Sequence, residues 1–326
     1  MKILLITDQH FGVRNDNQHF INHYARFYGK VVIPFIKASG IKEVISLGDT
    51  FDRRRYINFM SLDSAKEMWF DQLVKLGCNH TMLIGNHDIY YKNTLRVNAP
   101  HEILGEYNFD VIDKPTTKSY DGTDILLLPW ICDDNKSEVF EAVQRSKAPV
   151  CMGHLELNGF EAHPGHVMER GMDPMVFKKF KKVFTGHYHH KSRRGNITYL
   201  GNPYAMFWND YGDPRGFHLF DTKSLKLQWV KNPYEIFKKI YYNDLDQDMI
   251  IDYDSYKDTY VKVIVEEKKN YEKFEAMLDR LYEVGVHDVK IVETLIEEDS
   301  VGDSSLEIKD TLTLLNEYID EVEMTV

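Results

Sequence analysis

The chain has 326 residues, of which 43% are hydrophobic and 28% charged, and its formal net charge is −11. This composition excludes a disordered, collagen-like or disulfide-scaffolded chain, and the length allows two or three domains. The apolar runs are far shorter than the roughly 20 residues of a membrane-spanning helix, and the first residues lack the features of a signal peptide. The three cysteines form no CxxC pair. We therefore expect reduced thiols, a cytoplasmic protein and no membrane partner.

Short apolar runs, each of strand length, recur through the first 220 residues. They cover residues 3–6, 44–47, 81–84, 125–128, 150–152, 183–185, 198–200 and 217–220. Segments with helical spacing of apolar residues lie between the early runs, at 20–38 and 61–76. Strands that alternate with helices predict an α/β fold with a layered sheet.

The composition changes near residue 241. Residues 1–240 carry 32 Lys and Arg against 27 Asp and Glu, whereas residues 241–326 carry 8 against 24. A strand at 260–265, a helix between Asn270 and Gly285, and a strand at 289–292 predict a small α+β domain over 241–295. An acidic linker and a terminal helix fill 296–326, and one apolar face of this helix carries Ile308, Leu312, Leu315 and Ile319.

Five of the strand-sized runs lead directly to potential metal ligands. The polar residues that follow them are Asp8, His10, Asp49, Asn86, His87, Asp88, His154, His187 and His189. Because α/β sheets place their sites at the carboxyl ends of strands, we expect these side chains to converge. The i, i+2 spacing of Asp8 with His10, and of His187 with His189, turns both side chains of a pair to one side if the backbone stays extended. Glycines before several of these residues predict tight exits from the strands.

The donor types indicate which metals would bind. Two carboxylates, one amide carbonyl and four imidazoles without a thiolate suit Mn²⁺, Fe²⁺ or Zn²⁺ in a catalytic site rather than a closed structural zinc site. Seven donors are too many for one ion, and they suit two ions about 3.5–4 Å apart that share one carboxylate. We expect two divalent ions, with Mn²⁺ favoured and Mg²⁺ as the alternative.

The series DxH, GD, GNHD, GH and GHxH resembles the calcineurin-type metallophosphoesterase superfamily. The resemblance implies a layered β-sandwich flanked by helices. It also implies that one ion is held by Asp8, His10, Asp49 and His189, and the other by Asp49, Asn86, His154 and His187. By the same resemblance, His87 protonates the leaving oxygen or stabilises the developing charge, and Asp88 orients the His87 ring.

Further motifs narrow the resemblance. Residues 48–52 (GDTFD), 201–203 (GNP) and 213–217 (DPRGF) resemble bacterial SbcD and Mre-type DNA-repair nucleases. Residues 113–117, 129–130 and 154–160 resemble the nuclease subunits of T4-type phage recombination endonucleases. Some relatives have a histidine where Asp52 stands, and that histidine positions the DNA phosphate.

This narrower resemblance implies a nuclease acting on double-stranded DNA, in the host cytoplasm if the chain is phage-encoded. The small domain over 241–295 would be a DNA-capping domain. The terminal helix, with Ile308, Leu312, Leu315 and Ile319, would bind a coiled-coil ABC ATPase of the SbcC/Rad type. A homodimer would form through helices near 61–76. The chain has no GxxxxGK[ST] loop, so we expect its partner to supply ATP hydrolysis.

Two basic clusters lie close to the predicted site in the sequence. Arg53, Arg54 and Arg55 follow Asp49, and Lys191, Arg193 and Arg194 follow His189. Phosphate contact is expected for both clusters, although each is also typical of a solvated surface. Two other functions stay open: a phosphoesterase acting on a small phosphodiester or a phosphoprotein, and a non-catalytic dimeric scaffold for the ATPase.

Overall fold

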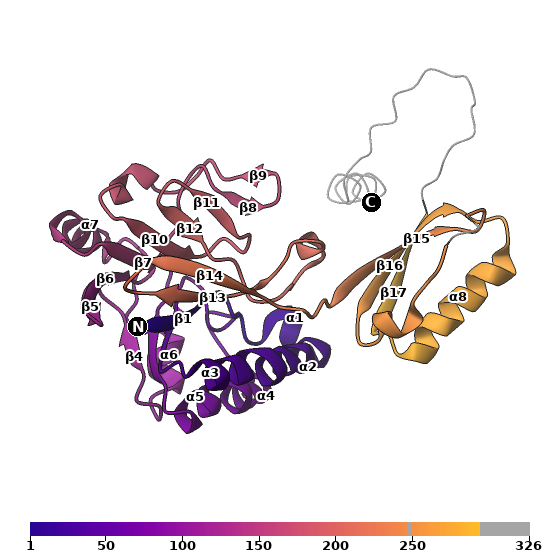
Figure 1. Cartoon of the computed structure of the whole chain (residues 1–326), viewed down its shortest axis with the longest axis horizontal. Helices are drawn as coiled ribbons and strands as arrows, with labels where there is room; N and C mark the ends of the chain where they lie inside the picture. Colours follow the sequence, from indigo (N-terminus) through magenta and orange to yellow (C-terminus); the bar gives the residue numbers. More distant parts are fainter. Residues whose placement is uncertain (247–248, 294–326) are drawn as a thin grey trace, which may run out of the picture.

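The computed structural model describes residues 1–246 and 249–293. Figure 1 shows a larger domain of stacked sheets and helices, with a small domain beside it. The predicted linker and terminal helix, including Ile308, Leu312, Leu315 and Ile319, lie outside the described residues.

The first sheet of the larger domain has the strand order β14-β13-β1-β2-β3-β4. Its strands are β1 (Lys2–Ile6), β2 (Glu43–Ser46), β3 (Asn79–Leu83), β4 (Asp110–Ile112), β13 (Gly216–Asp221) and β14 (Lys226–Lys231). The strands β1 to β4 run parallel, whereas β13 pairs antiparallel with β1. Parallel pairing places the ends of β1, β2 and β3 at one edge of the sheet.

The second sheet has the order β11-β12-β10-β7-β6-β5. Its strands are β5 (Thr116–Tyr120), β6 (Thr123–Leu128), β7 (Val150–His154), β10 (Lys182–Gly186), β11 (Ser192–Arg194) and β12 (Ile197–Tyr199). The central strands β6, β7, β10 and β12 are parallel. A buried cluster joins the two sheets face to face through Ile3, Leu5, Ile45, Leu127, Met152, Phe184 and others. Strands that are covered on both faces explain the continuous apolar runs in the sequence.

Helices cover the outer faces of both sheets (Figure 1). The first sheet packs against α2 (Gln18–Phe27), the π-helical turn η1 (Tyr28–Val32), α3 (Ile33–Ser39), α4 (Phe59–Ala65), the π-helical turn η2 (Lys66–Phe70) and α5 (Asp71–Lys75). The second sheet packs against α7 (Lys136–Arg145) and η3 (Pro174–Phe177). Shorter elements are α1 (Val13–Asp16), α6 (Ala99–Ile103), η4 (Trp208–Asp210), β8 (Glu161–His163) and β9 (His166–Val167). The layered α/β sandwich predicted from the sequence is confirmed, as are the helical segments at 20–38 and 61–76.

The small domain is a parallel sheet with one helix on it. The strands β15 (Phe237–Asn243), β16 (Tyr260–Glu267) and β17 (Asp288–Glu293) lie in chain order, and η5 (Tyr253–Tyr256) precedes β16. Helix α8 (Tyr271–Val284) begins at Asn270, whose side chain accepts the Lys273 N–H, and ends at Gly285 in the left-handed conformation. The predicted domain boundary at residue 240 falls inside β15.

The two domains meet at the start of α2. The His19 and His287 rings stack with centroids 3.7 Å apart, and the Tyr260 hydroxyl lies 3.4 Å from Asn17 Oδ1. In the described part of the chain, no helix has the length and apolar character needed to cross a membrane.

Candidate metal centre

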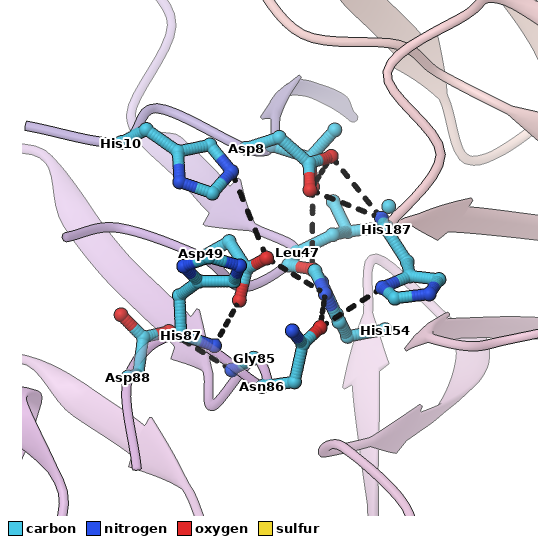
Figure 2. Close-up of polar contacts among 12 residues, drawn as sticks. Asp8, His10, Leu47, Asp49, Gly85, Asn86, His87, Asp88, His154 and His187 are labelled. Atoms are coloured by element: carbon cyan, nitrogen blue, oxygen red, sulfur yellow. Dashed lines mark hydrogen bonds and ion pairs between the residues drawn. The ribbon is translucent and has the colours of Figure 1, made fainter. Parts of the chain in front are cut away.

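The chain segments at the ends of β1, β2, β3, β7 and β10 carry polar side chains that come together in one cluster, and Figure 2 shows most of these side chains as sticks. Their polar side chains are withdrawn from solvent: Asp8 and His154 are fully buried, and Asp49 is 2% exposed. The structure brings together all seven residues predicted as ligands, although they span about 180 positions of the chain. Two sheets are needed for this site, because each contributes only part of the donor set.

The backbone at the centre differs from the extended form that the i, i+2 spacing predicted. Asp8 has φ 51°, His10 has φ 43°, Asp49 has φ 52° and His187 has φ 92°, all in the left-handed region that non-glycine residues rarely adopt. The backbone does not stay extended at Asp8 and His10, because the strand ends at Ile6 and the chain turns sharply there, and both side chains nevertheless reach the same cluster. Four strained residues in one buried cluster are typical of a functional site.

The tight strand exits predicted from the glycines are confirmed at Gly85 and Gly186. A Cβ atom at Gly85 would overlap the Asp49 carboxylate, and one at Gly186 would overlap the Thr7 hydroxyl beside Asp8. Any larger residue would therefore displace a carboxylate from the centre.

The carboxylate of Asp49 lies between the two halves of the cluster. Its Oδ2 atom is 3.7 Å from His10 Nε2 and 3.3 Å from His154 Nε2. Its Oδ1 atom accepts the His87 backbone N–H at 2.7 Å (Figure 2). One oxygen thus faces ring nitrogens from both halves, as a bridging carboxylate requires.

The remaining donors form two groups around this carboxylate. In one, His10 Nε2 and His189 Nε2 approach to 3.1 Å, and Asp8 lies in the same cluster. In the other, Asn86 Oδ1 lies 3.0 Å from His154 Nε2 and 2.9 Å from His187 Nδ1. His154 Nδ1 donates to the Leu47 carbonyl at 2.7 Å, which directs Nε2 into the centre. Oxygen and imidazole atoms that converge in this way fit divalent metal ions.

Buried charges set the protonation of these side chains. Burial alone would raise the pKa of Asp49, but the charge and hydrogen bond of His154 hold it well below its usual range. Burial alone would lower the pKa of His154, but the charge and hydrogen bond of Asp49 raise it to about 9. Burial lowers the pKa of His187 to about 3, and it keeps the pKa of His189 well below its usual range. These pKa values leave Asp49 ionised and His187 and His189 neutral, the forms that bind metal, whereas His154 is protonated beside Asp49 and would release that proton on binding an ion.

His87 and Asp88 have different surroundings. The His87 ring lies edge-on to the His10 ring with centroids 4.8 Å apart, and its Nδ1 atom donates to the Asp52 carbonyl at 2.6 Å. The role implied for Asp88, orienting the His87 ring, needs correction. The Asp88 carboxylate accepts backbone N–H groups of Thr50, Phe51 and Gly85 instead, and burial raises its pKa to about 6. Asp88 joins the loops after β2 and β3, and the Asp52 carbonyl sets the His87 ring.

Asp52 contacts two histidines of the centre. Its carbonyl accepts from His87, and its carboxylate Oδ1 lies 3.3 Å from His10 Nδ1. The other ring nitrogen of His10, Nε2, faces Asp49. Asp52 therefore fixes the orientation of the His10 ring. The sequence did not reveal this role, because relatives with a histidine at this position pointed to the DNA phosphate instead.

Some of the basic side chains predicted to contact DNA already have a partner within the protein, whereas others have no carboxylate partner. Arg53 forms an ion pair with Asp16 at 2.7 Å and also contacts Asn15, so this guanidinium supports the local structure. Lys191 lies 3.5 Å above the Trp229 ring. Arg193 and Arg194 make only long contacts with the Gly195 and Gly159 carbonyls. Arg54, Arg55, Arg193 and Arg194 have no carboxylate partner among the described residues.

Sequence reasoning missed a row of lysines in the small domain. Lys239, Lys262 and Lys290 are register partners across β15, β16 and β17, and they share the sheet face opposite α8. None of them has a carboxylate partner in the described part of the chain, but Lys239 Nζ lies 4.5 Å from the centroid of the Tyr211 ring and Lys262 Nζ lies 4.1 Å from that of the Trp208 ring. Lys290 is the exposed member of the row. Burial lowers the pKa of Lys262, and the charges of Lys290 and Lys239 lower it further. The row could not be found without the strand register, since β15 and β17 are short and far apart in sequence.

Comparisons with known proteins agree with this geometry. The family described as calcineurin-like phosphoesterase matches residues 1–191. Exonuclease subunit 1 of Enterobacteria phage T4 is 36% identical over 325 residues, covering 99% of this chain and 93% of the phage protein. These two matches confirm the resemblance inferred from the motifs.

Two solved structures share lower similarity. A novel archaeal phosphodiesterase is 14% identical, with a TM-score of 0.37, and the match covers 71% of this chain and 99% of that one. A protein of unknown function from Aquifex aeolicus is 20% identical, with a TM-score of 0.30, over 60% of this chain and 82% of that one. The family match over more than half of the sequence and the T4 relative are sufficient by themselves: the chain belongs to the calcineurin-like phosphoesterase family.

Proposed function

We propose that this chain is a two-metal-dependent DNA nuclease that hydrolyses phosphodiester bonds at duplex ends during recombination or repair. The observation that carries the proposal is the position of Asp49 Oδ2 between ring nitrogens of His10 and His154. The similarity to an exonuclease subunit over 99% of the chain supports DNA as the substrate. A buried pair of donor groups with one shared carboxylate has no evident structural purpose in a protein with this large apolar core.

One ion would be held by Asp8, His10, Asp49 and His189, and the other by Asp49, Asn86, His154 and His187. The carboxylate and imidazole donors favour Mn²⁺, with Mg²⁺ as the alternative. Metal ions held there would supply activation of a water molecule at neutral pH and neutralisation of charge on the phosphoryl oxygens. The buried walls of the site keep bulk water from the donors.

His87 is proposed as the proton donor to the leaving oxygen. Its Nδ1 atom must carry a hydrogen, because the Asp52 carbonyl at 2.6 Å can only accept. The ring then has its Nε2 atom free to hold a proton and release it to an oxygen in the site. The backbone N–H of His87 donates to Asp49, so the same residue orients the shared carboxylate.

Other parts of the chain supply binding surfaces in this proposal. Arg54, Arg55, Arg193 and Arg194 are available for contact with DNA phosphates, and the lysine row would contribute through its exposed member Lys290 and through Lys239 and Lys262 if these leave the rings that they cover. The small domain would act as a DNA-capping domain, and Ile308, Leu312, Leu315 and Ile319 would dock on an SbcC/Rad-type ATPase. A homodimer is supported by Phe59 and Met60 at the start of α4, which are 85% and 46% exposed. The site of action would be the cytoplasm of an infected host cell.

The direct test is cleavage of end-labelled linear duplex DNA by the purified chain in Mn²⁺, Mg²⁺ or EDTA. We expect cleavage in Mn²⁺ that is lost in EDTA and in Asp49→Ala, whereas His101→Ala, a half-exposed histidine outside the centre, retains it. His87→Ala should lose cleavage while it still binds Mn²⁺. Hydrolysis of a small phosphodiester without DNA cleavage, even with the ATPase present, would favour the small-substrate enzyme. Metal binding without any hydrolysis would favour the scaffold.

A further inference from the structure

A cavity opens beside the metal centre. Its volume is about 500 Å³, within the usual range for small-molecule pockets. His154 contributes to its lining, so the cavity adjoins the donors of one half of the centre. The proposed hydrolysis uses none of the other residues that line this cavity.

Trp130 separates the cavity from the metal centre. Its backbone N–H donates to the Ile84 carbonyl at 2.7 Å, which fixes it at the end of β3, immediately before Gly85 and Asn86. The Trp130 ring lies 5.0 Å from the His187 ring and 5.9 Å from the His154 ring, measured between centroids. The half-exposed indole also lines the cavity. An aromatic ring is thus held 5.0 Å from the ring of a proposed metal ligand, His187.

The opposite wall is built by a close backbone approach. The Met172 N–H donates to the Glu156 carbonyl at 2.8 Å, and a Cβ atom at Gly171 would lie 2.8 Å from that same oxygen. Gly171 has φ 112°, so this position requires glycine. Met172 and Val176, both half-buried, line the cavity together with Phe140 of α7.

The charges around the cavity are unlike those of a phosphate site. Three carboxylates, those of Asp133, Glu156 and Asp173, line it against one ammonium, that of Lys136. This balance repels phosphate and favours an uncharged, flat group with N–H donors. The apolar walls and the indole provide stacking surface for such a group.

We propose that this cavity binds the nucleobase of the nucleotide whose phosphodiester lies at the metal centre. The inference rests on the proposed nuclease function and adds that the substrate nucleotide must be unstacked, as at an end or in an unpaired segment. Trp130 stacks on the base, Phe140, Met172 and Val176 enclose it, and the carboxylates accept its N–H groups. The pocket therefore favours terminal or unpaired nucleotides over paired internal ones.

The test uses duplex DNA whose terminal residue is either a normal nucleotide or a tetrahydrofuran abasic analogue, at the 5′ or the 3′ end. An abasic end frays more easily, so without a base pocket it would be removed at least as fast. We expect the wild-type chain to remove the abasic residue with about tenfold lower kcat/KM than the normal one, at the end that it attacks.

Val176→Trp fills the cavity and Phe140→Ala opens its wall. In both variants we expect kcat/KM for the normal end to fall to the value that the wild-type chain shows for the abasic end. The value for the abasic end should not change. Met175→Trp is the matched control, because Met175 is 58% exposed and does not line the cavity, and it should keep the tenfold difference. If Val176→Trp does not fold, Phe140→Ala decides the question alone.

A binding measurement does not depend on turnover. DNA with a terminal 2-aminopurine is titrated with the chain in EDTA, and binding is followed by anisotropy. Fluorescence of the bound 2-aminopurine should be quenched in the wild-type complex and in Met175→Trp, but not in Phe140→Ala. Equal cleavage of normal and abasic ends, or no quenching in a saturated complex, would overturn the pocket proposal and leave the nuclease proposal standing. Absence of cleavage of either DNA would overturn the nuclease proposal itself.

Discussion

Single residues carry the chemistry of this site through their immediate neighbours. The sequence predicted the seven candidate ligands, because donor residues at the ends of parallel strands converge in any such sheet. It did not predict that Asp88 joins backbone loops or that Asp52 holds two histidine rings, since those roles depend on hydrogen bonds between separate loops. Residue type and spacing therefore identify the donors better than the groups that orient them.

Asp52 provides a test at this scale. We expect Asp52→Ala to weaken Mn²⁺ binding by roughly 10- to 100-fold, because the His10 ring loses the carboxylate that orients it. Asp52→Asn, which retains the carbonyl geometry and an oxygen near His10, should lose less. Titration calorimetry measures both, with the half-exposed Asp113→Ala as control. Unchanged affinity in Asp52→Ala would show that Asp52 does not position His10.

At the scale of elements, buried strands were easier to predict than exposed ones. Runs such as 44–47 and 150–152 are apolar on both faces, and each lies within or directly beside a strand of a sandwich core. Strand β5 (TTKSY) has almost no apolar residue, and β14 and β15 mix polar and apolar residues near the surface, so the sequence analysis did not identify them. The lysine row follows from the register of β15 with its neighbours, so it too required the structure.

The lysine row predicts a salt-dependent contact with DNA. Changing Lys239, Lys262 and Lys290 together to Gln should reduce the slope of log affinity against log salt by about 0.9 for each lysine that contacts a phosphate. Binding measured by anisotropy from low to moderate salt gives the slope. The triple change of Lys257, Lys269 and Lys273 to Gln is the charge-matched control in the same domain. Equal slopes for the two triple variants would exclude the row as a DNA contact.

Strand β3 carries a buried histidine that links stability to pH. Burial lowers the pKa of His80 to about 3, while the unfolded chain protonates it near 6.5. The unfolded state therefore binds more protons than the folded state below pH 6.5. As the pH falls toward 3, His80 lowers the free energy of unfolding by about 1.4 kcal/mol per pH unit. In chemical denaturation, the free energy of unfolding of His80→Gln should decline less steeply between pH 6.5 and 4.5 than that of the wild type. Parallel declines would contradict the buried neutral form.

The whole molecule combines the calcineurin-like phosphoesterase domain with a small domain, and the sequence predicted the elements of both better than the contacts between distant segments. The alternating strands and helices, the small α+β unit and its capped helix were predictable, because apolar patterning and helix caps are local signals. The stacking of two sheets was expected only from the family resemblance. The contact of His19 with His287 and the cavity beside Trp130 were not, because they join segments that are distant in sequence. The proposed homodimer likewise depends on a surface that only the folded structure reveals.

The exposed start of α4 predicts self-association. Phe59→Asp together with Met60→Asp should convert a dimer to a monomer in light scattering, because two exposed apolar side chains would become charged. Val167→Asp, at an exposed position in β9 and outside the helices expected to form the dimer, serves as the control. A wild-type chain that is monomeric at all concentrations tested would contradict the proposed homodimer.

The central claim is a centre for two ions that share Asp49. The most direct measurement is Mn²⁺ binding to the purified chain, by titration calorimetry for stoichiometry and by electron paramagnetic resonance for coupling between the ions. We expect two ions per chain, a spin-coupled spectrum in the wild type, and loss of the coupled signal in Asp49→Ala. A single bound ion, or two ions whose spectrum shows no coupling, would contradict the account.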